Sequence, residues 1–206
     1  MSLARIYSGA TGLGQLIIRA LGDVGGAPAS RVSEELDQII AWTAKAWRNI
    51  NLDTTAVGNV GGGTDDLMTY TVPASTLAAT NDALRIRMSG IVSAQDGGAG
   101  DTRTIVWSYA GNNIDSRVIN ATNAQCNWCI DLWIVRISTA NTVFYDSTWG
   151  AWNSGSDTAP LRSFKTQGTI AATHTNANVL KATGNSSDAV NNDIVQQLLV
   201  VDLCNQ

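Results

Sequence analysis

Charged side chains are scarce in this chain, and two types are nearly missing. They make up 15% of the 206 residues, whereas about a quarter is usual in soluble proteins. No glutamate follows Glu35, and lysine occurs only at Lys45, Lys165 and Lys181. Because glutamate favours helices, its absence from most of the chain indicates a domain built of strands and turns.

The sequence also lacks a basic cluster and a long apolar run. With a net charge of −4 and a pI near 4.8, it has no positive stripe for phosphates, so we expect no nucleic-acid partner. The apolar runs are shorter than the roughly 18 residues that a membrane-spanning helix needs, so we expect no membrane partner. Residues Met1–Arg5 lack the apolar core of a signal peptide, and we expect the protein to stay in the cytosol where it is made.

Cysteine and histidine are too few for a standard metal or redox site. Cys126 and Cys129 form a C-x-x-C, a spacing found in zinc and redox sites. They lie in a run typical of a strand, however, where positions three apart point to opposite faces. The single histidine, His174, is distant in the sequence. We therefore expect buried thiols, no metal site and no cofactor.

The residues that catalysis requires do not form a recognisable constellation. His174, the only possible imidazole base, lies in a polar turn-like segment. The best candidate carboxylates for a paired acid and base are Asp65, Asp66, Asp131 and Asp146, and no spacing ties them together. The segment Gly9–Gly14 resembles a dinucleotide-binding turn but lacks its third glycine and its acidic partner. We therefore expect no catalytic residue and no enzymatic activity.

Two amphipathic helices are predicted in the first fifty residues. The first begins near Leu13 and ends at Gly22; the second follows Ser30, a good N-cap, and continues to about Arg48. Each has one apolar face, which we expect to contact other protein subunits. The residues predicted for this interface are Leu13, Leu16, Ile17, Leu36, Ile39, Ile40 and Trp47.

The chain then changes from helical to alternating periodicity. Residues 1–50 are predicted to form an arm for docking and oligomerisation, residues 51–66 a glycine-rich linker, and residues 67–206 one β-domain. In Leu84–Ser89, apolar and polar side chains alternate as in a half-buried antiparallel strand. The other predicted strands are Leu67–Val72, Thr104–Tyr109, Ile114–Asn120, Trp128–Ile137, Thr142–Tyr145, Phe164–Ala171, Val179–Lys181 and Ile194–Leu203.

Short strands separated by polar turns favour a sandwich over a parallel sheet with crossover helices. The final run, Ile194–Leu203, has a periodicity that also fits a helix, but its β-branched residues favour a central strand. The predicted fold is therefore mainly β: a jelly-roll-like antiparallel β-sandwich with an N-terminal α-helical arm.

Three segments resemble a β-sandwich domain that recurs in virion proteins of tailed bacteriophages, among head-decoration (cement) and fibre components. They are Val57–Leu77, with its VGNVGGGTDDLMTYTV run, Leu84–Gly90, and Asn192–Val201. The resemblance covers about two-thirds of the chain. It implies a structural protein made in the host cytoplasm and incorporated into the virion.

The resemblance implies two alternative positions in the particle. The first is a head-decoration protein, a homotrimer, whose N-terminal arm binds the major capsid protein and stabilises the shell. The second is a receptor-binding or short tail-fibre module that recognises host glycans. For this alternative the candidate contacts are Trp149 and Trp152, because indoles in a glycine-rich loop can stack on sugar rings.

Overall fold

The computed structural model describes residues 47–94, 102–119, 125–153 and 162–205. The chain divides into two compact units, Met1–Lys45 and Ala46–Gln206. The helices predicted before residue 47 lie outside the described residues. So do six of the seven residues predicted for the subunit interface, namely Leu13, Leu16, Ile17, Leu36, Ile39 and Ile40.

The described part of the second unit is built from eleven strands. They are β1 (Arg48–Asp53), β2 (Val57–Gly58), β3 (Gly63–Val72), β4 (Ala83–Val92), β5 (Arg103–Tyr109), β6 (Asn112–Ile119), β7 (Cys126–Arg136), β8 (Thr142–Asn153), β9 (Arg162–Ala171), β10 (Asn178–Ser186) and β11 (Ile194–Cys204).

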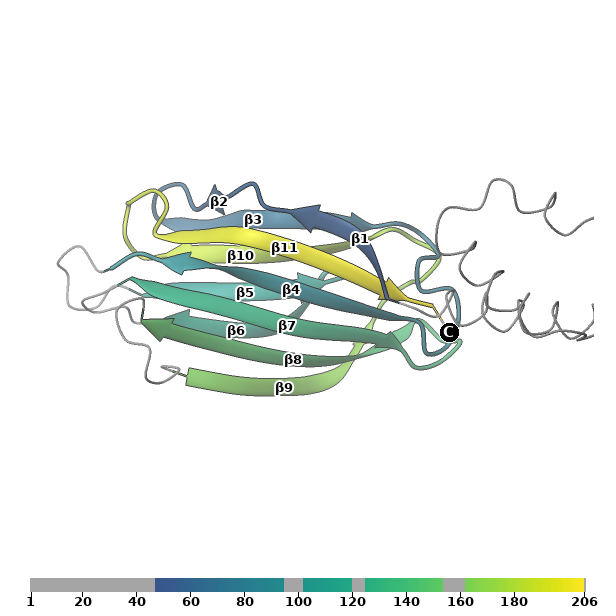
Figure 1. Ribbon diagram of the computed structural model, residues 1–206. Coiled ribbons are helices and arrows are strands. Elements are labelled where there is room, and N and C mark those ends of the chain that lie inside the picture. Colours follow the sequence, from purple (N-terminus) through teal and green to yellow (C-terminus); the bar gives the residue numbers. More distant parts are fainter. Residues whose placement is uncertain (1–46, 95–101, 120–124, 154–161, 206) are drawn as a thin grey trace, which may run out of the picture. The chain divides into compact units, whose positions relative to one another are not determined.

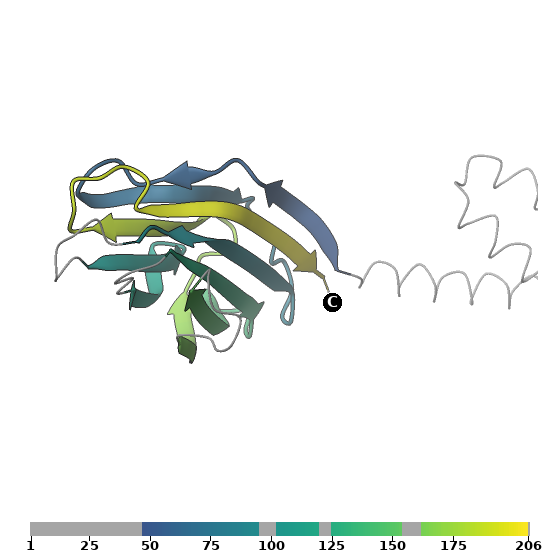
Figure 2. The same cartoon turned by 60° about the vertical axis from the view of Figure 1, so that its left-hand side comes forward.

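Two antiparallel sheets pack face to face (Figures 1 and 2). The larger sheet has the order β1-β11-β4-β7-β8-β9, with β2 also paired to β11; the smaller has the order β3-β10-β5-β6. Every pairing is antiparallel. The prediction of a mainly β antiparallel sandwich is therefore confirmed. In the part of the chain that the structure describes, no helix has the length and apolarity needed to span a membrane.

The predicted strands are present, and several are longer than expected. Ile194–Cys204 is a strand between β1 and β4, as its β-branched residues predicted. The start of the domain was predicted wrongly, however. Arg48 begins β1 and does not end a helix, and the predicted linker 51–66 holds the end of β1, all of β2 and the start of β3.

Residues 48–53 form a strand because they pair with a distant part of the chain. Asn49 lies opposite Asp202, and Leu52 opposite Val200, so β11 supplies the hydrogen-bonding partner for a segment with weak local strand character. Strand formation depends strongly on such context. In addition, the Tyr70 hydroxyl of β3 reaches the carbonyl of Ile50 at 3.4 Å, which links the two sheets along this side.

Large side chains from both sheets fill the space between them. Trp107 of β5 and Trp128 of β7 are fully buried. The Trp107 indole Nε1 donates a hydrogen bond of 3.0 Å to the Ser147 hydroxyl of β8, in the opposite sheet. This bond satisfies the one polar atom of the indole within an apolar core.

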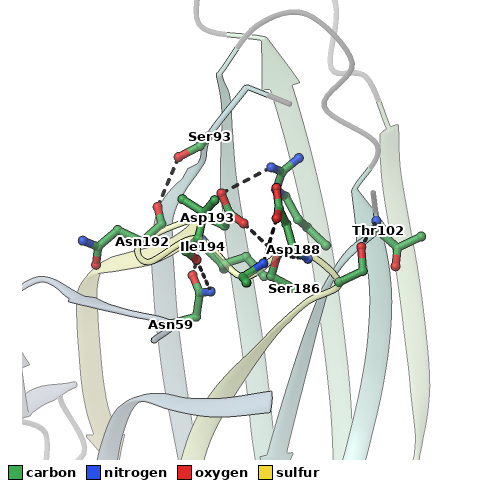
Figure 3. A network of polar contacts seen from close by, with 12 residues as sticks. Asn59, Ser93, Thr102, Ser186, Asp188, Asn192, Asp193 and Ile194 are labelled. Atoms are coloured by element: carbon green, nitrogen blue, oxygen red, sulfur yellow. Dashed lines mark hydrogen bonds and ion pairs between the residues drawn. The ribbon is translucent and has the colours of Figure 1, made fainter. Parts of the chain in front are cut away.

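A buried polar network closes one end of the sandwich (Figure 3). Arg103 and Asp193 form an ion pair, with Nη2 3.2 Å from Oδ1 and both side chains at most 1% exposed. Asp193 also accepts a 2.7 Å hydrogen bond from the Ser186 hydroxyl. The side-chain oxygen of Asn59 accepts a 2.8 Å bond from the Ile194 amide. The network thus fixes β5, β10, β11 and the segment after β2 to one another.

A β-bulge in β11 makes a further link between the two sheets. The register shifts between Gln196 and Leu198, opposite Gly90 of β4. Gln196 is fully buried, and its Oε1 accepts a 3.1 Å hydrogen bond from the amide of Met68 in the smaller sheet. The backbone of β11 approaches Gly90 so closely that a Cβ there would lie 1.9 Å from the carbonyl oxygen of Val195.

Candidate functional site

The outer face of the larger sheet carries a row of polar and aromatic side chains. Trp133 of β7 is 37% exposed, whereas its neighbours Leu132 and Ile134 are buried in the core. Because side chains alternate along a strand, Trp133 points away from the smaller sheet. The strand register places it in one row with Asp202, Arg85, Asp146 and Gln167.

Aromatic and cationic groups meet around Trp133. The ring of Trp47, just before β1, stands edge-on to it, with the centroids 5.2 Å apart and the planes at 85°. The guanidinium carbon of Arg85 lies 5.5 Å from the Trp133 ring centroid, within cation–π range. Trp47 is 43% exposed. Two large aromatic rings are therefore held in fixed positions at the surface.

Asp131 fixes the orientation of Arg85. Its two carboxylate oxygens accept bonds from Arg85 Nη2 at 2.7 Å and Nε at 3.2 Å, a bidentate geometry. The hydrogen bond and the charge of Asp131 raise the pKa of Arg85. We name the group Trp47, Arg85, Asp131 and Trp133 the Trp133 patch.

Further ion pairs border the Trp133 patch. Arg87 contacts Asp202 at 3.2 Å on one side, and Lys165 contacts Asp146 at 2.9 Å on the other. Exposed tryptophan and arginine surrounded by polar groups are typical of the centre of a protein–protein interface.

Of the predicted interface residues, only Trp47 is described. It lies outside any helix and packs on the sandwich itself, because the chain enters β1 at the next residue. Sequence reasoning did not select Trp133 or Arg85. A signal was available: in an alternating strand whose apolar positions include Trp128 and Ile130, Trp133 is the aromatic residue on the opposite face.

The two tryptophans proposed for glycan stacking do not share a surface. Both lie in strand β8, where a glycine-rich loop was predicted. Three positions apart, they face opposite sides of the sheet. Trp149 is in the core at 2% exposure, whereas Trp152 is 37% exposed. A sugar ring can therefore reach Trp152 but not Trp149.

The cysteines of the C-x-x-C and the four candidate aspartates are placed by strand β7 and by contacts within the fold. Cys126 faces the core and Cys129 the other face of β7, as the alternation predicted, and burial raises the pKa of both thiols. Among the described residues, no three histidine, cysteine or acidic side chains lie close enough to hold a metal.

The four candidate carboxylates contact different partners. Asp65 accepts a bond from the Val60 amide, Asp66 pairs with Lys181, Asp131 pairs with Arg85, and Asp146 pairs with Lys165.

No family model matches the sequence, and no curated protein matches it. Among solved structures, peanut lectin with a bound 9mer peptide is similar at a TM-score of 0.32 and 7% identity, over 78% of this chain and 92% of the lectin. The assignment of a two-sheet sandwich rests on the strand pairing itself.

His174 lies in the turn before β10 and is buried, at 5% exposure. Burial lowers its pKa, the charge of Arg136 adds to this effect, and the nearby backbone of Thr142 and Ala140 opposes it. In the unfolded chain the histidine has its ordinary pKa of about 6.5 and therefore binds a proton at a higher pH than in the folded protein. Stability is lost as the pH falls below that value.

We expect the urea unfolding midpoint to decline from pH 7.5 to 5.5, and to decline less in the His174→Gln variant. Equal declines in the two proteins would contradict the assignment of this pH dependence to His174.

Proposed function

We propose that this chain is a structural, non-enzymatic protein of a bacteriophage virion, most specifically an oligomeric head-decoration protein. Two observations support the proposal. The first is the resemblance of Val57–Leu77, Leu84–Gly90 and Asn192–Val201 to a virion sandwich domain. The second, which carries the binding role, is the Trp133 patch: two exposed indoles and an oriented arginine on a rigid sheet face.

In this proposal the Trp133 patch contacts the major capsid protein. Arg85 and Asp131 already neutralise each other, so the complementary surface needs an apolar pocket for the indoles and a polar rim, with little net charge of its own. The N-terminal arm, proposed to be α-helical, supplies a second contact, and a jelly-roll-like sandwich provides the rigid body. Three copies around a symmetry axis would engage the shell together.

The mechanism is stabilisation by selective binding. A protein that binds only the mature shell lowers the free energy of that state and leaves the others unchanged. Each copy adds a modest contact, and the linked contacts of a trimer raise the apparent affinity well above that of one site. No chemical step is needed for this stabilisation.

A head-binding assay tests the proposal. Purified protein is mixed with expanded heads that lack it, assembled from a candidate major capsid protein, and the heads are then sedimented and heated. We expect co-sedimentation at a fixed stoichiometry and a higher disruption temperature. Binding to host polysaccharide with no binding to heads would instead support the fibre module, with Trp152 as its remaining candidate contact.

Trp133→Ala should weaken head binding while the domain stays folded. Truncating an interface tryptophan costs about 2 kcal/mol or more in binding, roughly thirtyfold in affinity. The same change removes the contacts with Trp47 and Arg85, so we also expect a loss of about 1–3 kcal/mol in the free energy of unfolding, and head binding is compared at a temperature where the variant is folded. The matched control is Trp152→Ala, an equally exposed indole on the neighbouring strand β8, opposite Asn127 and outside the Trp133 patch. Equal head affinities for the two variants would place the interface elsewhere.

A further inference from the structure

Strand β9 forms one lateral edge of the larger sheet (Figures 1 and 2). It pairs with β8 on one side, and no described strand pairs with its other side. No residue from Phe164 to Ala171 is buried. The Ala171 carbonyl accepts a 2.8 Å bond from the Asn112 side chain, so the free edge extends from Phe164 to Ile170. Such an edge presents backbone N–H and C=O groups that can bond a strand of another chain.

The other described edges of the two sheets are irregular, whereas β9 is regular. Strands β1 and β6 each have a register shift in their pairing, and so does β3 where it pairs with β10. Shifts of this kind twist an edge and hinder its pairing with another chain. By contrast, β9 pairs with β8 continuously from Arg162 to Ala171 and contains no proline. Its backbone is therefore suited to accept a further strand.

The long polar side chains of β9 are directed away from its free edge. Lys165 is the only charged residue between Phe164 and Ala171, and its Nζ lies 2.9 Å from the Asp146 carboxylate of β8. Gln167 donates from Nε2 to the same carboxylate at 3.1 Å. A lysine on an edge strand usually discourages pairing with another chain. Here the ion pair holds it over its own sheet, so it does not block the edge.

The inner side of β9 is fixed by β6 of the smaller sheet. The Thr166 hydroxyl donates to the Asp115 carboxylate, which also pairs with Arg117. The guanidinium carbon of Arg117 lies 4.5 Å from the ring centroid of Phe164. These contacts balance the two charges at this side of the sandwich and hold β9 extended. Binding of a further strand would therefore cost little ordering of β9.

The apolar residues of the free edge are placed symmetrically about Gln167. Phe164, which is 39% exposed, and Ile170, which is half-buried, each lie three positions from it. Both face inward, because their partners in β8 are the core residues Trp149 and Val143. An antiparallel strand of the same sequence, centred on Gln167, would match this pattern. The free edge is thus complementary to itself.

We propose that β9 pairs antiparallel with β9 of a second copy of this chain, about a two-fold axis beside Gln167. Each Phe164 then lies opposite Ile170 of the other copy, and cross-strand pairs of aromatic and β-branched residues stabilise a sheet. Each Lys165 lies opposite Thr169 of the other copy, so like charges do not face each other. The pairing adds about six to eight backbone hydrogen bonds and joins the two larger sheets.

This dimer does not depend on the proposed function, because no residue of the Trp133 patch takes part in it. A strand paired with its own copy makes an isologous contact, which closes at two subunits. The contact therefore differs from the three-fold association of the proposed trimer. On a shell it would join subunits of neighbouring trimers.

A cysteine at the axis tests both the pairing and its register. In Gln167→Cys, the two Cα atoms at position 167 would lie about 4.5–5.5 Å apart, within the range of a disulfide. The matched control is Thr169→Cys, on the same face of β9, where the two copies would lie about 14 Å apart. The full-length variants and the unsubstituted protein are oxidised mildly and separated by non-reducing electrophoresis. We expect a linked dimer of Gln167→Cys and about tenfold less of Thr169→Cys.

A competition experiment separates a specific dimer from random collisions. A roughly tenfold excess of unsubstituted protein should lower the yield of linked Gln167→Cys several-fold, because mixed pairs contain one introduced cysteine. Both substituted positions are exposed, so the reduced variants should unfold in urea close to the unsubstituted protein. No linked dimer at position 167, equal yields at the two positions, or a yield that the excess leaves unchanged would each overturn the proposal.

Discussion

Asp193→Ala is expected to destabilise the sandwich by about 3–5 kcal/mol, because it leaves a buried guanidinium without its counter-ion. Arg103 is fully buried, and its Nε and Nη1 have no hydrogen-bond partner among the described residues. Loss of the carboxylate also removes the acceptor of the Ser186 hydroxyl. Urea or thermal unfolding of the variant measures the effect directly.

A matched control is available in an exposed ion pair. Asp66 contacts Lys181 at 2.6 Å, but the two side chains are 55% and 33% exposed. Water and salt screen such a pair, so Asp66→Ala should change the free energy of unfolding by about 1 kcal/mol or less. If the two substitutions had similar effects, the Arg103–Asp193 pair would not be the structural element proposed here.

The network joins parts of the chain that are far apart in the sequence. Asn59 belongs to the segment Val57–Leu77, and Asp193 and Ile194 belong to the segment Asn192–Val201. In the structure these residues meet at one end of the sandwich (Figure 3). Asn59 and Asp193 therefore help to hold the fold together.

Strands with strong alternation could be predicted from the sequence, and strands that depend on a distant partner could not. Leu84–Ser89 alternates clearly, and β4 contains it. By contrast, β1 has a mixed sequence, RNINLD, and pairs with β11, about 150 residues further along the chain. Nothing local distinguishes such a segment from a helix end followed by a linker. Its conformation is decided by tertiary pairing.

The candidate surface was predictable only in part, for a related reason. Alternation shows that Trp133 and Arg85 face away from the core, but it does not show that they lie opposite each other on neighbouring strands. That requires the register between β4 and β7. Trp149 and Trp152 were expected in a loop, where side chains do not alternate between two faces. Only within a strand does this alternation show that the two indoles point to opposite sides.

Gly90→Ala should cost more than most single substitutions in this protein. A Cβ at position 90 would lie 1.9 Å from the Val195 carbonyl oxygen and 2.9 Å from the Cα of Gln196, and both are backbone atoms that cannot rotate away. Strands β4 and β11 would have to separate at the bulge. Gln196 would then lose its bond to the Met68 amide. We expect a loss of about 3 kcal/mol or more, at or above the upper range for overpacked cores.

Gly111→Ala separates this steric effect from a general intolerance of glycine replacement. Gly111 lies in the turn between β5 and β6 with a φ of 77°, and no atom of the described residues lies within 4 Å of a Cβ built there. Its replacement should therefore cost only the strain of a left-handed backbone, about 1–2 kcal/mol. A smaller loss for Gly90→Ala than for Gly111→Ala would mean that β4 and β11 can move apart freely. The bulge, and the link through Gln196 to the smaller sheet, would then contribute little to the rigidity of the sandwich.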